Sequence, residues 1–495
     1  MTSTVPRWRL RAFVLAAIML AVGSVAGLSP ESAVAATWKP IAGTGSTWSQ
    51  NALDQWRKNV ATNYGMTINY SGTGSSAGRR DFIAGQVDFA VSEIPFQLKP
   101  EDGSAPEKPA ADSFAYMPIV AGGTAFMYNL KIGGKKVTNL QLSGETVTKI
   151  FTGVITNWND PVIAADNPTL VLPDKAIIPV VRSDGSGSTA QFTLWMSKQH
   201  SALWNAYCGK VGRATPCGLT SQFPASGAMK AQSGSLGVSG YVSQAYGEGG
   251  ITYVEYSYAL KSGFPVARIK NSSGAYVEPT APNVAIALTK AQINTTVSSP
   301  DYLTQILDGV YNNPAATSYP LSSYSYLIVP TKVAGIFTAD KGKTLAAFAR
   351  YLLCDGQLQA SQLGYSPLPA NLVAAGFDQV KRIPGGEGAT ACAAGIGAAT
   401  PGAADGAAPA DAAASGGDAA AVGDGTSIGS GGELGGDGTT LTGAQAASSP
   451  FTLPKDDFGP SQTLMIGAGV LVVLLVLLPP LFSRRLRRWG PAGRE

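Results

Sequence analysis

Three short segments of the chain share a design that suits anion binding. Each is a turn rich in Gly, Ser and Thr that leads into an expected helix: GTGSTW at 43–48, GTGSSAG at 72–78 and RSDGSGST at 182–189. Such a turn presents backbone N–H groups and hydroxyls at a helix N-terminus, where the helix dipole favours an oxyanion. One turn alone favours simple helix capping, because Ser, Thr and Gly are ordinary caps. Three of them favour a shared anion pocket.

Three charged residues extend this prediction. Arg182 carries a planar fork of donors that matches two oxygens of an oxyanion, and Asp184 is placed either to hold that fork or to cap the following helix. Glu93 follows an expected strand, and α/β folds bind ligands at the carboxyl ends of strands. A carboxylate suits an anion site only when the ligand carries a proton, as monohydrogen phosphate does and sulfate does not. The alternative for Glu93 is an exposed loop acid.

Enzymes form a competing class. The segment GSSAG at 74–78 matches the Gly-x-Ser-x-Gly nucleophile elbow of serine hydrolases, with Ser76 as the nucleophile. His200 is the one histidine of the chain, and the end of an expected helix is a poor position for a catalytic base. No phosphate-binding Gly-x-x-x-x-Gly-Lys-Ser/Thr loop of an ATPase occurs. We therefore expect no catalytic residue, no metal site and no cofactor.

Expected strands alternate with expected helices through the middle of the chain. The strands are predicted at 66–70, 87–91, 176–181 and 250–254, and the helices at 48–60, 77–84, 144–151, 189–198 and 341–353. This alternation predicts an α/β fold, and about 350 residues of it favour two lobes over one.

The four cysteines are an even number in a chain that carries an export signal, so we expect disulfides. Three pairings are possible. We favour Cys208 with Cys217, which closes a short loop, and Cys354 with Cys392.

Both ends of the chain have the composition of targeting or anchoring segments. Residues 1–36 carry three arginines, an apolar run and small residues before Ala36, as in a secretory signal peptide. Residues 464–482 are an apolar run long enough to span a bilayer, and the arginines of the 483–495 tail predict that this tail is cytoplasmic. Residues 384–463 are rich in Gly, Ala and Asp and predict a disordered linker.

Composition and charge limit which classes of ligand and partner the chain is expected to bind. The formal net charge is +4, and residues 384–454 contain seven acidic side chains and no basic one, so the preceding body is basic. A basic body favours anionic ligands. We expect no nucleic-acid partner, because no stripe of Lys and Arg interleaved with aromatics is present.

In these motifs the chain resembles the PstS-type phosphate-binding proteins, the solute receptors of phosphate ABC importers. The resemblance covers roughly residues 40–380. It rests on GTGSTW at 43–48, YSGTGSS at 70–76, VDFAVSE at 87–93 and RSDGSGS at 182–188, with support from IFTG at 150–153, NWND at 157–160 and GITYVEY at 250–256.

The resemblance implies the two-lobed periplasmic-binding-protein fold of type II, with the anion between the lobes. The phosphate-binding domain is then 37–383, with lobe I at 37–121 and 319–383 and lobe II at 122–318, and the chain crosses between lobes near Gly122 and Tyr319. The implied ligand set is Thr47, the Trp48 backbone, Ser75, Glu93, Arg182 with Asp184 steadying it, Ser186, Gly187 and Ser188. Three of these depart from the family pattern: Glu93 stands for the usual proton-accepting Asp, Ser188 for Thr and Trp48 for Phe.

The function that the resemblance implies is an extracytoplasmic receptor that binds inorganic phosphate and delivers it to ABC permease subunits. The single C-terminal membrane helix expected at 464–482 departs from the family, whose members are commonly free in the periplasm or lipid-anchored at the N-terminus. Two alternatives remain open. The chain could bind another oxyanion such as sulfate or molybdate, or it could be a surface phosphate sensor or scaffold that does not serve transport.

Overall fold

The computed structural model describes residues 38–100, 102–296, 299, 301–302 and 304–392. The predicted signal peptide, the predicted membrane helix, the basic tail and nearly all of the predicted linker lie outside these residues. Within the described part of the chain, no helix is both long and apolar enough to span a bilayer.

The centre of the fold is a sheet whose described strands follow the order β2-β1-β3-β15-β4-β10-β8-β9. Pairing is parallel from β2 to β1 and β3 and from β10 to β8 and β9, whereas β15, β4 and β10 pair with antiparallel neighbours. The strands are β1 (Ile41–Gly45), β2 (Ile68–Ser71), β3 (Phe89–Ser92), β4 (Phe114–Tyr128), β8 (Ile178–Arg182), β9 (Lys230–Gln232), β10 (Gly250–Glu255) and β15 (Ser322–Pro330).

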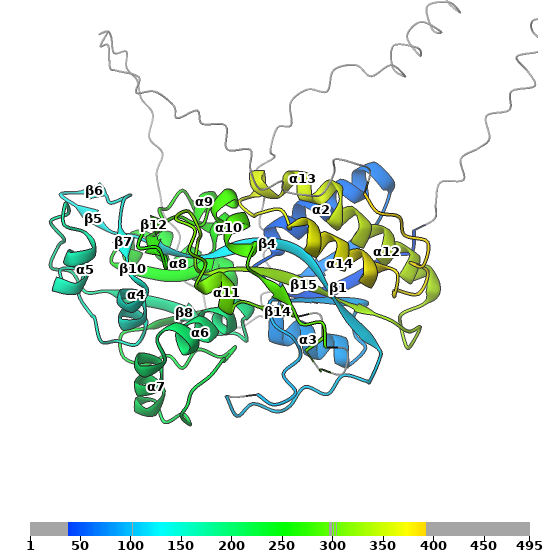
Figure 1. The fold of residues 1–495 in the computed structure, drawn as a ribbon, viewed down its shortest axis with the longest axis horizontal. Coiled ribbons are helices and arrows are strands. Elements are labelled where there is room, and N and C mark those ends of the chain that lie inside the picture. The colour runs from blue at the N-terminus through cyan, green and yellow to red at the C-terminus, as the bar shows by residue number, and fades with distance from the viewer. Residues whose placement is uncertain (1–37, 101, 297–298, 300, 303, 393–495) are drawn as a thin grey trace, which may run out of the picture. The chain divides into compact units, whose positions relative to one another are not determined.

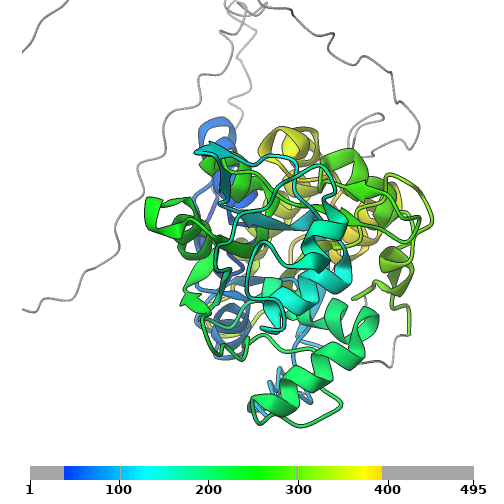
Figure 2. The same cartoon turned by 90° about the vertical axis from the view of Figure 1, so that its left-hand side faces the viewer.

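Two halves of the sheet carry separate sets of helices (Figure 1). The blue and yellow half holds α2 (Gln50–Tyr64), α3 (Ser75–Ile83), α12 (Ala339–Leu353), α13 (Asp355–Ala360) and α14 (Ala370–Val380). The cyan and green half holds α4 (Gly144–Phe151), α5 (Pro161–Asp166), α6 (Gly187–Gln199), α7 (Ser201–Lys210), α8 (Gly234–Ser243), α9 (Tyr256–Ser262), α10 (Ala281–Leu288) and α11 (Asp308–Tyr311). Viewed from the end of this second half, its cyan and green helices lie in front (Figure 2).

Strand β4 connects the halves, because it exchanges partners along its length. It pairs with β15 from Phe114 to Gly123 and with β10 from Thr124 onward. The second connection lies against the first, since the Thr124 amide donates to the Leu321 carbonyl at 2.9 Å and the Tyr319 hydroxyl donates to the Thr124 carbonyl at 2.7 Å. The exchange therefore occurs beside the two crossings predicted near Gly122 and Tyr319.

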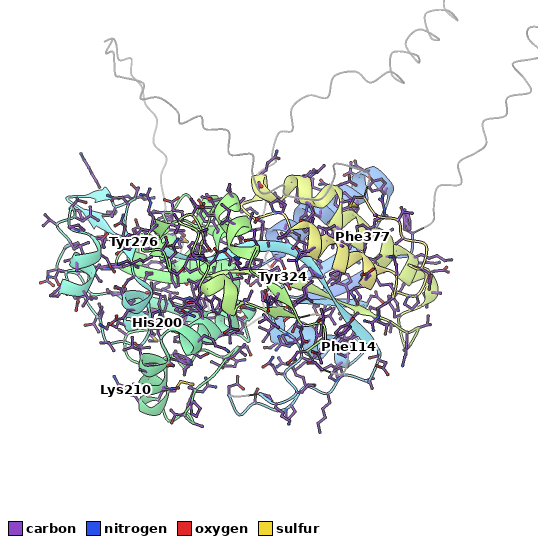
Figure 3. The ribbon with its side chains drawn as sticks, viewed as in Figure 1. Phe114, His200, Lys210, Tyr276, Tyr324 and Phe377 are labelled. Atoms are coloured by element: carbon purple, nitrogen blue, oxygen red, sulfur yellow. A yellow bond between two sulfur atoms is a disulfide. The ribbon has the colours of Figure 1, made fainter. Side chains whose placement is uncertain are left out.

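The smaller strands form short ribbons at the edges of the halves. They are β5 (Lys131–Ile132), β6 (Lys135–Lys136), β7 (Gln141–Leu142), β11 (Arg268–Lys270), β12 (Tyr276–Val277), β13 (Gln292–Ile293) and β14 (Gln305–Ile306). The buried core is apolar and aromatic. Of its residues, Tyr324 lies near the middle of the view and Phe377 in the blue and yellow half (Figure 3).

Both disulfides are present in the pairing that the sequence analysis favoured. Cys208 bonds Cys217 beyond α7, and Cys354 bonds Cys392 with a Cα–Cα distance of 5.4 Å. The second bond holds residues that follow the predicted domain boundary at 383. The Arg350 Nε also donates to the Thr390 carbonyl at 3.1 Å. The chain thus remains attached to α12 up to Cys392.

Candidate functional site

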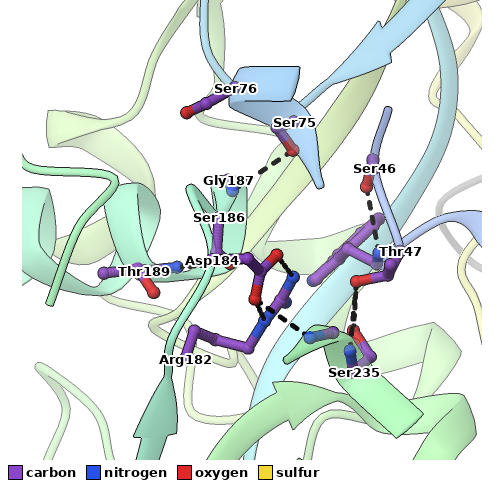
Figure 4. A network of polar contacts seen from close by, with 12 residues as sticks. Ser46, Thr47, Ser75, Ser76, Arg182, Asp184, Ser186, Gly187, Thr189 and Ser235 are labelled. Atoms are coloured by element: carbon purple, nitrogen blue, oxygen red, sulfur yellow. Dashed lines mark hydrogen bonds and ion pairs between the residues drawn. The ribbon is translucent and has the colours of Figure 1, made fainter. Parts of the chain in front are cut away.

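Each of the three predicted turns joins a sheet strand to a helix N-terminus. The first connects β1 to α2, the second β2 to α3, and the third β8 to α6. The helices α3 and α6 begin two residues earlier than predicted, at Ser75 and Gly187, so more of each turn belongs to a helical first turn. The second and third turns come from different halves and touch: the Gly187 amide donates to Ser75 Oγ at 3.2 Å, and the Ser76 amide donates to the Gly185 carbonyl at 3.1 Å (Figure 4).

Two glycines permit this close approach. Gly74, the N-cap of α3, has a φ of 92°, and a Cβ there would lie 2.6 Å from Asp184 Oδ2. A Cβ on Gly187 would lie 1.8 Å from Glu93 Oε2 and 2.7 Å from Ser75 Oγ. A side chain at either position would force the contacting carboxylate or the adjacent backbone to shift.

Glu93 is buried, with 1% of its surface exposed, and is not an exposed loop acid. Its Oε2 accepts a hydrogen bond from Ser75 Oγ at 2.7 Å, and its Oε1 accepts from Ser325 Oγ at 2.7 Å and from Ser46 Oγ. Gly187, at the N-terminus of α6, lies against the same carboxylate. Its neighbours therefore satisfy this buried acid with neutral hydroxyls, without an ion pair among the described residues.

Arg182 and Asp184 form a two-point ion pair inside the same region. Arg182 Nε donates to Asp184 Oδ1 at 2.7 Å and its Nη2 donates to Oδ2, while 3% of Arg182 is exposed. Burial alone would raise the pKa of Asp184. The Arg182 guanidinium and the Gly234 amide, which donates to Oδ1 at 2.9 Å, outweigh burial and hold that pKa below its ordinary value. The pair partly neutralises the charge of the Arg182 guanidinium and fixes the orientation of this group.

Thr47 is held by a fourth turn of the same design. Its Oγ1 lies 2.9 Å from Ser235 Oγ and accepts the Ser235 amide at 3.1 Å, and its carbonyl accepts the Tyr258 hydroxyl. Ser235 is in the first turn of α8, directly after β9. The first turn of lobe I therefore also contacts lobe II (Figure 4).

The remaining predicted residues take different roles in this structure. Ser186 Oγ caps α6 by accepting the Thr189 amide at 3.2 Å. Ser188 is 2% exposed, and its Oγ has no hydrogen-bond partner among the described residues. The Trp48 amide donates to Ser46 Oγ at 3.0 Å, and the Trp48 ring packs edge-on against Tyr365, away from Glu93 and Arg182.

The serine-hydrolase alternative has no geometric support. Ser76 Oγ donates to Ser221 Oγ at 3.1 Å and accepts from Arg79 Nη2 at 3.2 Å. His200 lies between α6 and α7 with its ring 4.9 Å from that of Trp195, in the cyan and green half (Figure 3). The described residues also contain no cluster of three or more side chains suited to hold a metal ion. What the site can offer is hydrogen bonds, one oriented guanidinium and one carboxylate acceptor, which are the elements of binding.

Sequence reasoning missed several residues that hold the site together. Ser235 had a usable signal, because SGS at 233–235 is a further Gly/Ser turn between a strand and a helix. Ser325 had none, since it lies inside the strand β15. Gln191 and Gln305 also escape any motif, although both donate to the Glu93 carbonyl, at 2.7 and 2.9 Å.

Comparison with known proteins agrees with this architecture. Residues 30–356 match the family model described as a PBP superfamily domain. A phosphate-binding protein PstS of Xylella fastidiosa is 32% identical over 70% of this chain and 86% of its own length. The PstS of Pasteurella multocida is 31% identical over 67% of this chain and 87% of its own length.

Among solved structures, a high-affinity periplasmic phosphate-binding protein crystallised with phosphate shares the fold, with a TM-score of 0.51 and 21% identity over 68% of this chain and 92% of that one. The sequence relatives and the family model together decide the assignment. The chain belongs to the PstS-type family of phosphate-binding proteins, which are solute-binding proteins and not enzymes.

Proposed function

We propose that this chain binds inorganic phosphate between its two lobes and delivers it to an ABC import permease. The observation that carries the proposal is that Gly187 contacts both Ser75 and Glu93. This contact brings the N-terminus of α6 in lobe II, which favours an anion, next to a carboxylate of lobe I. A ligand at this place needs negative charge to interact with the helix N-termini and Arg182, and it needs a proton to donate to Glu93. Monohydrogen phosphate has both.

The ligand set of the proposal is the one that the family resemblance implies. Thr47, Ser186, Gly187 and Ser188 would supply hydroxyl and amide donors, together with the Trp48 amide and the Ser75 amide, since the Ser75 hydroxyl donates to Glu93. Arg182 would bind two oxygens while Asp184 holds its direction, and Glu93 would accept the ligand's proton. Ser188 supports this set, since a buried hydroxyl without a partner is a donor ready for a ligand.

Closure of the two lobes would remove water from the anion and strengthen each of these contacts. Opening would release the anion when the receptor is docked on its permease. The Thr47–Ser235 and Ser76–Ser221 hydrogen bonds join the lobes beside the site and would break on opening.

Membrane attachment is the second part of the proposal. The signal peptide at 1–36 would direct export, and the apolar run at 464–482 would hold the receptor at the outer face of the cell membrane. A flexible linker of about 70 residues would let the binding domain range over roughly 45 Å. Fractionation of cells with antibody against the binding domain, before and after removal of residues 464–482, measures this directly: loss of the membrane signal is expected.

Calorimetry on the purified full-length chain in mild detergent tests the binding function. Bound anion is first stripped, and phosphate and then sulfate are titrated. Tight phosphate binding with no sulfate heat is expected. Equal binding of both anions would mean that Glu93 does not accept a proton from the ligand, and would favour a general oxyanion receptor. No binding of either would overturn the proposal in favour of a scaffold.

A further inference from the structure

Glu93 is anchored by its surroundings at both its backbone and its side chain. The two glutamine amides of Gln191 and Gln305 donate to its carbonyl, and they come from α6 and β14. Gln305 is itself fixed, because its Oε1 accepts the Tyr324 amide at 3.1 Å and its Nε2 also donates to the Tyr324 carbonyl. The backbone position of the acid is therefore set by three separate elements.

The side chain has a longer reach than an aspartate and one more rotatable bond, so it needs more contacts to hold one orientation. Ser325 supplies one of them from the middle of β15. Its Oγ donates to Glu93 Oε1 at 2.7 Å, on the same oxygen that accepts Ser46 Oγ. Ser325 is fully buried on a strand that carries the lobe crossing, so its hydroxyl has little freedom to move.

The number of donors has a consequence for the ligand. An ionised carboxylate offers about four acceptor positions, two on each oxygen. Ser46 and Ser325 occupy Oε1, and Ser75 occupies one position on Oε2. The remaining position belongs to Oε2, the oxygen that faces Gly187 at the N-terminus of α6.

We infer that Ser325 is a positioning residue that, with Ser46, holds Oε1 of Glu93 and turns Oε2 toward the anion with room for one donated proton. The inference deepens the proposed phosphate function and rests on it. Ser325 then affects selectivity without contacting the ligand. It holds the orientation of the Glu93 carboxylate, whose Oε2 accepts a proton from a protonated anion and repels an unprotonated one.

The matched control for Ser325 lies two residues earlier on the same strand. Ser323 is also buried, and its Oγ has no hydrogen-bond partner among the described residues. Ser325→Ala and Ser323→Ala therefore remove the same atom from the same strand, one with and one without a carboxylate contact.

The experiment titrates phosphate into the full-length chain and into both variants by calorimetry, with sulfate as a competitor and thermal melting as a check on folding. Ser325→Ala is expected to weaken phosphate binding about tenfold, because a hydrogen bond to a charged group is lost, while sulfate still gives no binding heat. Ser323→Ala is expected to stay within about twofold for both anions.

A double-mutant cycle separates positioning from general damage. In a Glu93→Gln background the added Ser325→Ala change should have little further effect on phosphate affinity, because its target has already been altered. Simple addition of the two losses would overturn the inference, because it would mean that Ser325 does not act through Glu93. If the unaltered chain binds phosphate and Ser325→Ala behaves like Ser323→Ala, the positioning role alone fails. If the unaltered chain binds no phosphate, the proposed function fails with it.

Discussion

Two buried glutamates of this protein have almost the same exposure and very different surroundings. Glu93, in the proposed anion site, accepts hydrogen bonds from three hydroxyls. Glu255 lies at the lobe junction, which we define as Trp48, Glu255, Ser257 and Tyr365. Its Oε2 accepts the Ser257 amide at 2.8 Å, whereas its Oε1 has no hydrogen bond of ordinary geometry among the described residues.

The difference shows that burial alone does not determine the role of a carboxyl group, because its hydrogen-bond donors differ from site to site. Burial raises the pKa of Glu255 well above its ordinary value, and the nearby Ser257 and Tyr365 hydroxyls offset this only in part. A carboxyl in that position is favoured in its neutral form and serves as the N-cap of α9. Glu93 instead accepts hydrogen bonds from hydroxyls at both carboxylate oxygens, and its Oε2 lies beside Gly187 at a helix N-terminus.

The largest expected effect comes from removing the Arg182 guanidinium, the cation of the proposed anion site. The lobe junction has no ion pair among the described residues, so it offers no comparable change. Arg182→Ala should weaken phosphate binding by roughly 10²–10³-fold, because it leaves the ligand without a guanidinium and the half-buried Asp184 carboxylate without its partner. Calorimetry measures the loss. Arg268→Ala, which breaks the exposed pair with Glu278, is the control and should leave affinity unchanged. Unchanged affinity in Arg182→Ala would remove this residue from the site.

The next effect tests the contact between the lobes at Glu93. Gly187→Ala places a methyl group 1.8 Å from Glu93 Oε2, so either the acid or the helix must shift, and phosphate affinity should fall about 100-fold. Gly209→Ala, in α7, meets nothing within 4 Å and serves as the control. It should leave binding intact and raise stability slightly, by about 0.5–1 kcal/mol. Equal affinities in the two variants would mean that this contact is not part of the closed site.

A smaller effect separates binding from folding within one helix turn. Ser188→Ala removes a buried hydroxyl without a partner in the described structure, so phosphate affinity should fall about tenfold with an unchanged melting temperature. Ser186→Ala removes the cap on the Thr189 amide as well as a proposed ligand hydroxyl, so phosphate affinity should fall and the free energy of unfolding should also drop, by about 1 kcal/mol. Melting curves with and without phosphate distinguish the two. A stability loss in Ser188→Ala would contradict a ligand role.

The smallest effect concerns the junction itself. Because the folded-state pKa of Glu255 lies above the unfolded value of about 4.3, its contribution to stability is fully present below that pH and is lost as pH rises through the folded pKa. Glu255→Gln should therefore raise the melting temperature at pH 8 by roughly 2–4 °C and leave it nearly unchanged at pH 4. The comparison of the two pH values is the measurement, with Glu145→Gln on the surface as control. A lower melting temperature at pH 8 would show that the charged form is needed.

Local sequence was sufficient for several of the elements, although the long central strands β4 and β15 were not predicted. The strand and helix patterns predicted β3, α4 and α12 within a few residues, because alternation and helical periodicity are properties of neighbouring residues. The Gly/Ser turns and the Arg182–Asp184 spacing were visible for the same reason. The signal peptide and the membrane helix remain predictions from composition, since they lie outside the described residues.

Contacts between distant segments decided the rest. Ser325 reaches Glu93 across 232 positions of the chain, and Ser235 reaches Thr47 across 188. The contrast between Glu93 and Glu255 likewise depends on which strands and helices become neighbours. In the sequence both are single glutamates that follow an apolar strand. The number of donors that surround each one is set only when the sheet brings β15, α3 and α6 to the first and leaves the second against Gly122, Trp48 and Tyr365.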